Sequence, residues 1–349
     1  MTKFGNSTLF KLIHDYLKVY LPKQRKLSHN TIRSYREALE LLVDFVKAQK
    51  NIPLQDVTFE MLTAETVTAY LAYLEDERGC SVATRNNRLA AVRAFLEYAA
   101  DRDVTTAFVL NDMKKVPVKK PNKVEAIHYM SMAAITAIVE QTDATSPKGL
   151  RDRVFMILMY DTGARIQEMI DIKICDLRLG KTSTVMLHGK GSKIRSVPLM
   201  DKTVQHLHKY ISVFHDDVPS ASEVPLFYSE IHGRRNALSD RRIRYLLKDY
   251  GSKARAVCPE VPENVHPHLW RHSRAMHLYQ QGMDLTLVSQ WLGHAQLETT
   301  QVYAFADTEH KRKAIAAATP KDNPLNTKLS PGRFTVSDEE TLKRLTGLR

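Results

Sequence analysis

The sequence predicts a mainly α-helical protein, in which a small helical bundle precedes a mixed α/β domain with a small antiparallel β-sheet. Apolar residues recur at helical spacing through the first hundred residues. A stretch rich in lysine and proline then interrupts the helical pattern, and the clearest β-prone runs lie in the middle of the chain between helical segments. These three observations together define the predicted fold class.

The first hundred residues are predicted to form about four helices. Residues 9–20 carry apolar side chains at helical spacing, and Pro22 is expected to end that helix. Ser28 is a predicted N-cap for a second helix. A third helix is expected over residues 64–76, and a fourth begins after Ser81.

The stretch MKKVPVKKPNK at residues 113–123 contains two prolines and five lysines, which disfavour a helix. We interpret it as an extended linker that can lie along a phosphate backbone, with a surface loop as the alternative. The expected organisation is a helical domain at 1–111, a linker at 112–125, a second domain at 126–320 and a tail at 321–349.

The second domain contains the β-prone region. Runs at 184–187 and 194–199 flank a glycine-rich turn, and residues 176–179 are a candidate third strand. Helical patterns surround this region, at residues 131–141, 150–160, 285–292 and 299–306.

The tail is predicted to contain one short helix. Ser337 and Glu340 have capping-box spacing, and three leucines follow them. So few leucines cannot form a core alone. Docking of the helix on a neighbouring subunit and packing on its own domain are equally compatible with the pattern.

The composition indicates a soluble globular protein with a polyanionic partner. Of the 349 residues, 51 are Lys or Arg and 39 are Asp or Glu, which gives a net charge of +12. This surplus favours nucleic acid first and an acidic membrane surface second. The three cysteines are too scattered for a disulfide framework or a thiolate zinc site. Without a signal-peptide core or membrane-length apolar run, we expect a cytoplasmic, nucleoid-associated protein.

Two segments of the second domain place cationic side chains where they can bind an anion. Arg165 follows Gly163 at an expected helix start, and Glu168 is placed one turn on to orient it. Lys190 lies between two glycines at the expected hairpin tip. Taken alone, a surface Arg–Glu pair and a solvated lysine are the simpler interpretations.

Two later segments add histidines, a further arginine and a tyrosine. His268 and Arg271 lie three apart and share a helix face. His268 and His272 have zinc-helix spacing, but the glutamate of that motif is absent, so no metal is expected. His294 and Tyr303 follow. A lone tyrosine on a helix is usually a core residue, and a lone histidine is usually structural.

Together these segments resemble the tyrosine recombinase (phage integrase) family, which includes the Xer-type recombinases. The family's active-site pattern is Arg, Lys, His-x-x-Arg, His or Trp, and Tyr. The sequence supplies it in order, with spacings like the family's, as Arg165, Lys190, His268, Arg271, His294 and Tyr303. The phrases Thr-Gly-Ala-Arg, Leu-Gly-His and Thr-Thr-Gln-Val-Tyr also resemble family segments. Among the departures, Trp270 and Arg274 replace an aliphatic and an aromatic residue.

The resemblance implies an Xer-like, two-domain integrase of a mobile element, with a SAM-like core-binding bundle ahead of the catalytic domain. Tyr303 would attack the scissile phosphate and form a 3′-phosphotyrosyl link, with His268 as a candidate base for its proton. Arg165, Arg271 and His294 would stabilise the phosphate, and Lys190 would protonate the departing 5′ oxygen. Neither ATP nor a metal or other cofactor is implied.

The implied partner is double-stranded DNA at specific sites, bound by a homotetramer that exchanges strands through a Holliday junction. Partner recombinases or a DNA-bending factor are compatible with this assembly. Candidate DNA contacts are Thr84, Arg85, Arg88 and Lys193, with a solvated basic helix face as the alternative for the first helical domain.

Two other functions compete with the recombinase. A type IB topoisomerase shares the tyrosine chemistry but would relax supercoils as a monomer, whereas the separate bundle and the tail helix favour a recombinase. A DNA-binding accessory factor would need no active site, and the complete set of six residues argues against it. Integration, transposition and chromosome-dimer resolution all fit this architecture.

Overall fold

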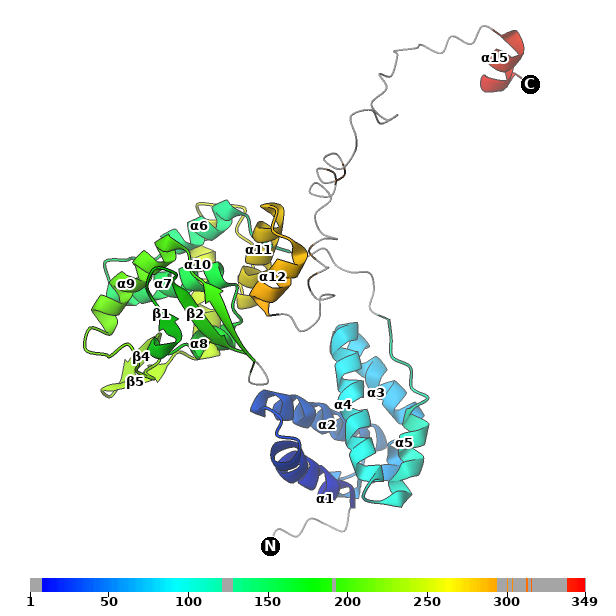
Figure 1. Ribbon diagram of the computed structural model, residues 1–349. Coiled ribbons are helices and arrows are strands. Elements are labelled where there is room, and N and C mark those ends of the chain that lie inside the picture. The colour runs from blue at the N-terminus through cyan, green and yellow to red at the C-terminus, as the bar shows by residue number, and fades with distance from the viewer. Residues whose placement is uncertain are drawn as a thin grey trace. The chain divides into compact units, whose positions relative to one another are not determined.

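The computed structural model describes residues 8–120, 128–189, 193–293, 300, 303, 312, 315 and 338–348. The chain divides into two compact units, Met1–Glu125 and Ala126–Arg349, here called unit 1 and unit 2 (Figure 1). Both units are mainly helical and unit 2 contains small antiparallel sheets, so the predicted fold class is confirmed. In the part of the chain that is described, the helices are too short or too polar to cross a membrane.

Unit 1 is a bundle of helices joined by short 3₁₀ turns. Several helices begin where the sequence predicts, because hydroxyl groups of Ser28, Thr63 and Ser81 accept hydrogen bonds from backbone N–H groups in the first turn. The α-helices are α1 (Thr8–Asp15), α2 (His29–Lys50), α3 (Ala64–Asp76), α4 (Val82–Ala100) and α5 (Ala107–Met113). The 3₁₀ turns are η2 (Leu54–Asp56), η3 (Phe59–Met61) and η4 (Val104–Thr106).

Pro22 does not end the first helical segment, so that expectation is wrong. Helix α1 passes directly into a π-helix, η1 (Tyr16–Gln24), which includes Pro22. The N–H of Arg25 donates to the carbonyl of Tyr20, five residues back, at 2.9 Å. The wider π-turn changes which carbonyl faces the proline ring, so the helix continues past it.

The basic segment after α5 packs on unit 1 as far as it is described. The Arg85 guanidinium donates to the carbonyl of Pro117 at 2.8 Å, and the Asn86 amide donates to the carbonyl of Lys119 at 2.7 Å. The Lys119 ammonium lies 2.7 Å from the Glu75 carboxylate. The first part of the segment expected to be an extended linker is therefore held on α3 and α4.

Unit 2 surrounds its sheets with helices. The helices are α6 (Met132–Glu140), α7 (Pro147–Thr162), α8 (Ile166–Ile170), η5 (Ile174–Asp176), α9 (Asp201–Phe214), α10 (Asp240–Arg255), α11 (Pro267–Gln280), α12 (Leu285–Leu292) and α15 (Glu339–Leu345). The strands are β1 (Leu177–Arg178), β2 (Thr184–His188), β3 (Ile194–Pro198), β4 (Tyr228–Ile231) and β5 (Arg234–Ala237).

The predicted strands form an antiparallel sheet of order β1-β2-β3. Val185 faces Val197 across β2 and β3, and both are buried, so the alternating apolar residues set the register. The N–H of Gly189 donates to the carbonyl of Lys193 at 2.7 Å beyond the last strand pair. The expected hairpin tip at 190–192 lies outside the described residues.

A second hairpin, β4-β5, was not predicted. Its turn places His232 and Gly233 at positive φ, 50° and 71°. The second strand reads Arg-Arg-Asn-Ala and is largely exposed, so it lacks the alternating apolar residues that identify a half-buried strand.

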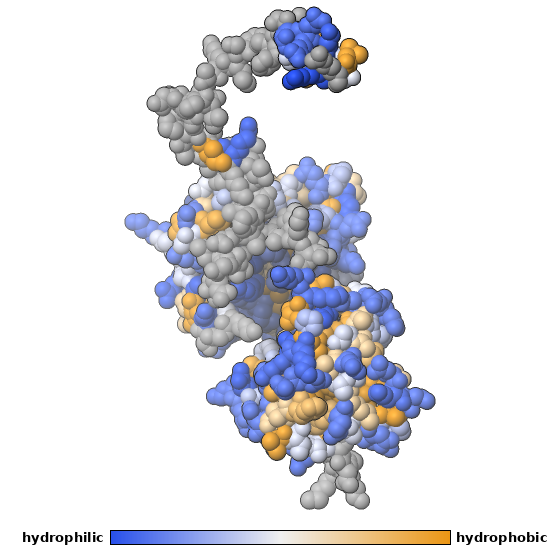
Figure 2. All heavy atoms as spheres, turned by 90° about the vertical axis from the view of Figure 1, so that its right-hand side faces the viewer, coloured by the Kyte–Doolittle hydropathy of each residue, from blue (hydrophilic) through white to orange (hydrophobic). Residues whose placement is uncertain are grey.

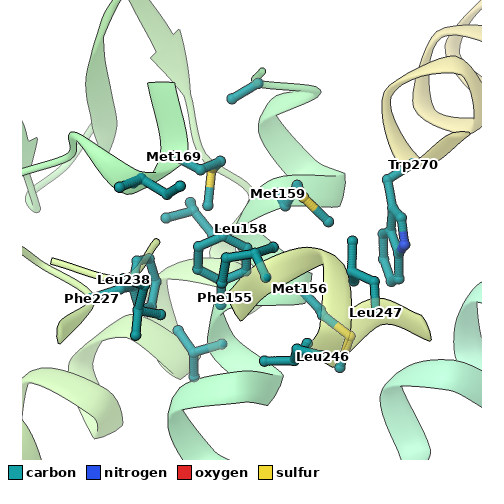
Figure 3. Close-up of a cluster of buried hydrophobic side chains, with 14 of the residues drawn as sticks. Phe155, Met156, Leu158, Met159, Met169, Phe227, Leu238, Leu246, Leu247 and Trp270 are labelled. Carbon is teal, nitrogen blue, oxygen red and sulfur yellow. The ribbon is translucent and has the colours of Figure 1, made fainter. Parts of the chain in front are cut away.

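The core of unit 2 forms around α7, which is buried along most of its length. Figure 3 shows side chains of this helix meeting those of α10 and the ring of Trp270 on α11. Because α7 and α11 share this core, the end of α7 at Thr162 and the first turns of α11 are fixed relative to each other. The labelled core residues are Phe155, Met156, Leu158, Met159, Met169, Phe227, Leu238, Leu246, Leu247 and Trp270.

The leucines of the short helix α15, and Leu348 just beyond its end, are exposed. Leu342, Leu345 and Leu348 are 50%, 72% and 76% exposed, so they are not packed into the core of unit 2. The carboxylate of Asp338 caps the helix, and Ser337 of the predicted capping box lies outside the described residues. Elsewhere, Figure 2 shows hydrophilic side chains over most of the coloured surface, with small hydrophobic patches among them.

Candidate active site

Four of the six residues singled out for chemistry are described: Arg165, His268, Arg271 and Tyr303. Lys190 and His294 lie outside the described residues, although the glycines that precede them, Gly189 and Gly293, are described. The described members belong to unit 2 and meet where the C-terminal ends of α7 and α12 approach α11.

Arg271 occupies the centre of this region. Its side chain is buried, and its two terminal nitrogens donate to the carbonyls of Gly163 and Leu292 at 2.7 and 2.6 Å. The ends of α7 and α12 that supply these carbonyls are both capped by glycines at positive φ, Gly163 at 59° and Gly293 at 66°. The positive φ at Gly163 favours glycine, and a Cβ there would also lie 2.9 Å from the Leu292 side chain.

Burial lowers the pKa of Arg271 to about 9, and the positive charge of Arg165 contributes next. Among the described residues, Arg271 forms no ion pair with a carboxylate. A desolvated guanidinium beside a second guanidinium is stabilised by a bound anion. This arrangement therefore suits a phosphate.

Arg165 is the N-cap residue of α8, and its side chain extends towards the C-terminal end of α12. One nitrogen of its half-exposed guanidinium donates to the Glu168 carboxylate at 2.9 Å, and the other lies 3.4 Å from the carbonyl of Gly293. The backbone N–H of Arg165 also donates to Glu168, at 2.8 Å. Glu168 thus orients Arg165, as its position one turn on suggested.

Arg195 on β3 is a member of this network that sequence reasoning did not single out. Its terminal nitrogens donate to both oxygens of Glu168 at 2.9 and 2.8 Å, and its Nε donates to the carbonyl of Trp291 at 3.1 Å. A Cβ at Gly293 would meet the Arg195 side chain at 3.0 Å. Arg195 therefore connects the strand after the hairpin tip to the segment before His294.

Glu168 is held ionised by this network. Burial alone raises the pKa of its carboxyl, but hydrogen bonds from Arg195 and from the backbone of Arg165, with the charge of Arg195, outweigh that effect and lower the pKa to about 2. A carboxylate whose pKa is lowered in the folded state stabilises the fold above its unfolded pKa, and that stabilisation disappears as the pH falls towards the folded value.

Glu168→Gln is expected to lower the free energy of unfolding by about 3 kcal/mol at pH 7, since each unit of pKa shift corresponds to roughly 1.4 kcal/mol. The difference from wild type should shrink as the pH falls from about 4.5 towards 2, where the wild-type carboxyl becomes protonated. Urea titrations across this range measure it. Glu140→Gln, at an exposed glutamate, should change stability by less than about 0.5 kcal/mol. A difference that does not depend on pH would contradict this account.

His268 lies at the exposed side of the site, on the first turn of α11. Desolvation, followed by the positive charges of Arg244 and Arg271, lowers its pKa. Arg244 belongs to α10, whose solvent face also carries Arg241, Arg242 and Lys248. This basic face was not identified from the sequence, although the apolar positions of α10 recur at helical spacing and leave the arginines on the opposite side.

Tyr303 is the most buried of the candidates, with 1% of its surface exposed. It packs against the core formed by α11 and α12, and burial raises the pKa of its hydroxyl to about 12, with Arg271 opposing that shift. Its hydroxyl lies 2.9 Å from Nδ1 of His272. The histidine against the hydroxyl is therefore His272 rather than His268, the candidate base from the sequence.

The candidate DNA contacts differ in accessibility. Thr84 and Arg88 line a cleft of about 450 Å³ between α2 and α4, and Lys193 is exposed at the start of β3. Arg85, by contrast, is 3% exposed and bonded to Pro117. In this conformation Arg85 positions the segment after α5 and is not presented to a phosphate.

The described residues contain no group of three or more histidine, cysteine, aspartate or glutamate side chains that could hold a metal ion.

The comparisons with known proteins agree on one family. The sequence profile of the Phage integrase family matches residues 128–310, and that of the phage integrase N-terminal SAM-like domain matches residues 13–103. Tyrosine recombinase XerD of Staphylococcus epidermidis is 30% identical over 315 residues, which cover 89% of this chain and 99% of that protein. A putative integrase/recombinase of Sinorhizobium fredii, y4rC, is 29% identical over 321 residues, 92% of this chain and 94% of that protein.

Solved structures show the same fold. The XerH site-specific recombinase, bound to its difH substrate before cleavage, has a TM-score of 0.63 at 21% identity, covering 85% of this chain and 82% of its own. The Tn1549 transposon integrase, in complex with transposon right end DNA, has a TM-score of 0.63 at 17% identity, covering 88% and 99%. Since one family profile covers more than half of the chain and a tyrosine recombinase matches it over nearly its whole length, the chain belongs to the phage integrase family and is a site-specific tyrosine recombinase.

Proposed function

We propose that this recombinase cleaves and rejoins DNA through a 3′-phosphotyrosyl link to Tyr303, with neither metal nor ATP. The observation that carries the proposal is the convergence of Arg165 and Arg271 on the glycine-capped ends of α7 and α12, with Tyr303 in the adjoining core. The charge of Arg271 acts on the Tyr303 hydroxyl, so the anion site and the nucleophile lie within electrostatic reach of each other.

Each of these residues has a separate role in the proposed reaction. Arg165 and Arg271 hold the non-bridging oxygens of the phosphate and stabilise the charge that develops there. Lys190 and His294 take the roles that the resemblance assigns to them, proton donor to the 5′ oxygen and further donor to the phosphate. The covalent link conserves the energy of the phosphodiester, so a 5′-hydroxyl of a second strand can reverse the step without a nucleotide cofactor.

Two surfaces, one in each unit, are the proposed DNA contacts. In unit 1, Thr84 and Arg88 line the cleft between α2 and α4. In unit 2, the arginines of α10 extend from His268 along one helix face, and Lys193 flanks the hairpin tip. Contacts of this kind release counterions, so binding is expected to weaken steeply with salt.

The proposed substrate is a pair of specific duplex sites. In support, the XerH complex contains its difH substrate, and the Tn1549 integrase complex contains transposon right end DNA. A homotetramer on DNA, assisted by a partner recombinase or a bending factor, is the proposed assembly. The exposed leucines of α15 are available for contacts between its protomers. A mobile element is the proposed setting, supported by the fold shared with a transposon integrase.

Trapping of the cleavage intermediate tests this function. The chain is mixed, in EDTA and without ATP, with duplexes made from the two ends of its own genetic element, each nicked so that the cleaved fragment diffuses away. We expect an SDS-resistant protein–DNA complex, because religation is then blocked. Sequence-scrambled duplexes of equal length provide the control for site specificity.

Two outcomes would favour the competing functions. Specific binding to these ends without a covalent complex would favour a DNA-binding accessory factor. Covalent complexes on scrambled and specific duplexes alike, together with relaxation of supercoiled plasmid lacking the sites, would favour a type IB topoisomerase.

A further inference from the structure

His272 holds a position that the proposed chemistry has not yet used. Helix α11 carries His268, Arg271 and His272, and the last of these turns towards the core where Tyr303 lies. Nδ1 of His272 and the hydroxyl oxygen of Tyr303 are 2.9 Å apart, and the two ring centroids are 5.8 Å apart. This is hydrogen-bond distance from the proposed nucleophilic oxygen.

The charge state of the pair allows the Tyr303 hydroxyl to donate to His272. Burial, followed by the charges of His268 and Arg271, lowers the pKa of His272 to about 4. Its imidazole is therefore neutral at physiological pH, while the Tyr303 hydroxyl, with its raised pKa, keeps its proton. With the imidazole hydrogen on Nε2, Nδ1 has a free lone pair, so the hydroxyl donates and His272 accepts.

His268 is placed differently. It is exposed at the start of α11, and its ring lies 6.5 Å from that of His266. Within the described part of the chain, His272 is the histidine whose ring nitrogen contacts the Tyr303 hydroxyl. His272 is therefore the better placed of the two histidines to act on the nucleophile.

We propose that His272 is the base that accepts the phenolic proton when Tyr303 attacks the scissile phosphate, an inference that rests on the proposed function. As the bond between the Tyr303 oxygen and phosphorus forms, the proton moves to Nδ1 of His272. The bond from phosphorus to the 5′ oxygen breaks, and that oxygen takes a proton from Lys190. In religation the imidazolium returns its proton to the departing tyrosine oxygen.

Phosphate binding strengthens this base. In the DNA-free chain the positive charge of Arg271 disfavours protonation of His272. A phosphate held by Arg271 offsets that charge, so the imidazolium becomes less costly when the substrate is in place. Simultaneously, bond formation to phosphorus makes the phenolic proton far more acidic. Transfer is therefore favoured only with DNA bound.

His272→Asn tests the role, because an amide oxygen near Nδ1 can accept the hydrogen bond but cannot take the proton. We expect DNA binding and melting temperature close to wild type, with covalent complex formation on the nicked duplexes slower by about 10²–10⁴-fold. His208→Asn, at an exposed histidine of α9, is the matched control and should cleave at the wild-type rate. His272→Gln is a second variant if the asparagine destabilises the fold.

Two chemical substitutions distinguish a base from a structural residue. Site-specific 3-fluorotyrosine at position 303 has a more acidic phenol, so it should reduce the deficit of His272→Asn. A duplex with sulfur in place of the 5′ bridging oxygen needs no proton on its leaving group. It should restore cleavage to Lys190→Ala but leave His272→Asn slow.

The outcomes distinguish a failure of the assignment of His272 as the base from a failure of the proposed function. If wild type and His208→Asn form the covalent complex and His272→Asn and His272→Gln form it equally fast, His272 is not the base. The same conclusion follows if the sulfur-containing duplex fully rescues the His272 variants, or if fluorination leaves their deficit unchanged. If wild type itself forms no covalent complex, the proposed function fails and the base assignment with it.

Discussion

Replacing Tyr303 with phenylalanine is expected to abolish the covalent protein–DNA complex, with a fall of more than about 10³-fold in the rate of strand cleavage. The loss of a covalent nucleophile removes the step itself. Specific DNA binding should survive within about twofold, because the buried hydroxyl faces His272 and not the solvent. Denaturing gels of the trapped complex and gel-shift titrations measure the two quantities.

Tyr129→Phe provides the matched control for this change. Tyr129 lies at the surface of unit 2, and its hydroxyl accepts a hydrogen bond from the Gln280 amide at 3.0 Å. Removal of this hydroxyl should leave cleavage unchanged and cost at most about 1 kcal/mol of stability. A Tyr303→Phe chain that still forms the SDS-resistant complex at the wild-type rate would exclude Tyr303 as the nucleophile.

The second large effect is expected at Arg271. Arg271→Lys keeps the positive charge. The guanidinium of Arg271 donates to the carbonyls of Gly163 and Leu292 and, in the proposed function, also to the phosphate. A single ammonium group cannot replace all of these hydrogen bonds. We expect cleavage to slow by about 10²–10³-fold, the usual effect of losing a preorganised donor to a developing anion. Stability should fall by about 1–3 kcal/mol, because a buried carbonyl loses its partner.

Arg274→Lys separates these two effects. Arg274 lies one turn further along α11 and donates through Nε and a terminal nitrogen to the backbone carbonyl and carboxylate of Asp161, at 3.2 and 3.1 Å. Its replacement should cost stability without slowing cleavage below the melting temperature. If Arg274→Lys slows cleavage as much as Arg271→Lys, the effect arises from the packing of α11 and not from a phosphate clamp. Single-turnover cleavage and thermal melts measure both variants.

The elements predicted best are those whose signal is local. Helices α3 and α12 occupy the residues expected of them, because apolar periodicity and end residues lie within each segment. Strands β2 and β3 are similarly marked by alternation and a glycine-rich turn. The hairpin β4-β5 was missed because its exposed, arginine-rich second strand carries no alternation. At Pro22, a π-turn overrode the usual effect of proline on a helix.

The site residues were predicted from motifs and their spacing. Motifs and spacing did not predict which side chains pair through tertiary contacts. Arg195 meets Glu168 from 27 residues away, and His272 meets Tyr303 from 31 residues away, so no local period relates them. Arg85 illustrates a signal that was present but unused. It lies four residues before Leu89 on the buried face of α4, so its helical position indicated burial rather than DNA contact.

On the proposed mechanism, Tyr303 carries the DNA during the reaction. The direct measurement is peptide mapping of the trapped complex, in which nuclease and protease digestion leaves a nucleotide remnant on one peptide for mass spectrometry. We expect the remnant on the tyrosine oxygen of Tyr303, attached through a 3′-phosphate. A remnant on any other side chain, or a 5′-phosphate linkage, would contradict it.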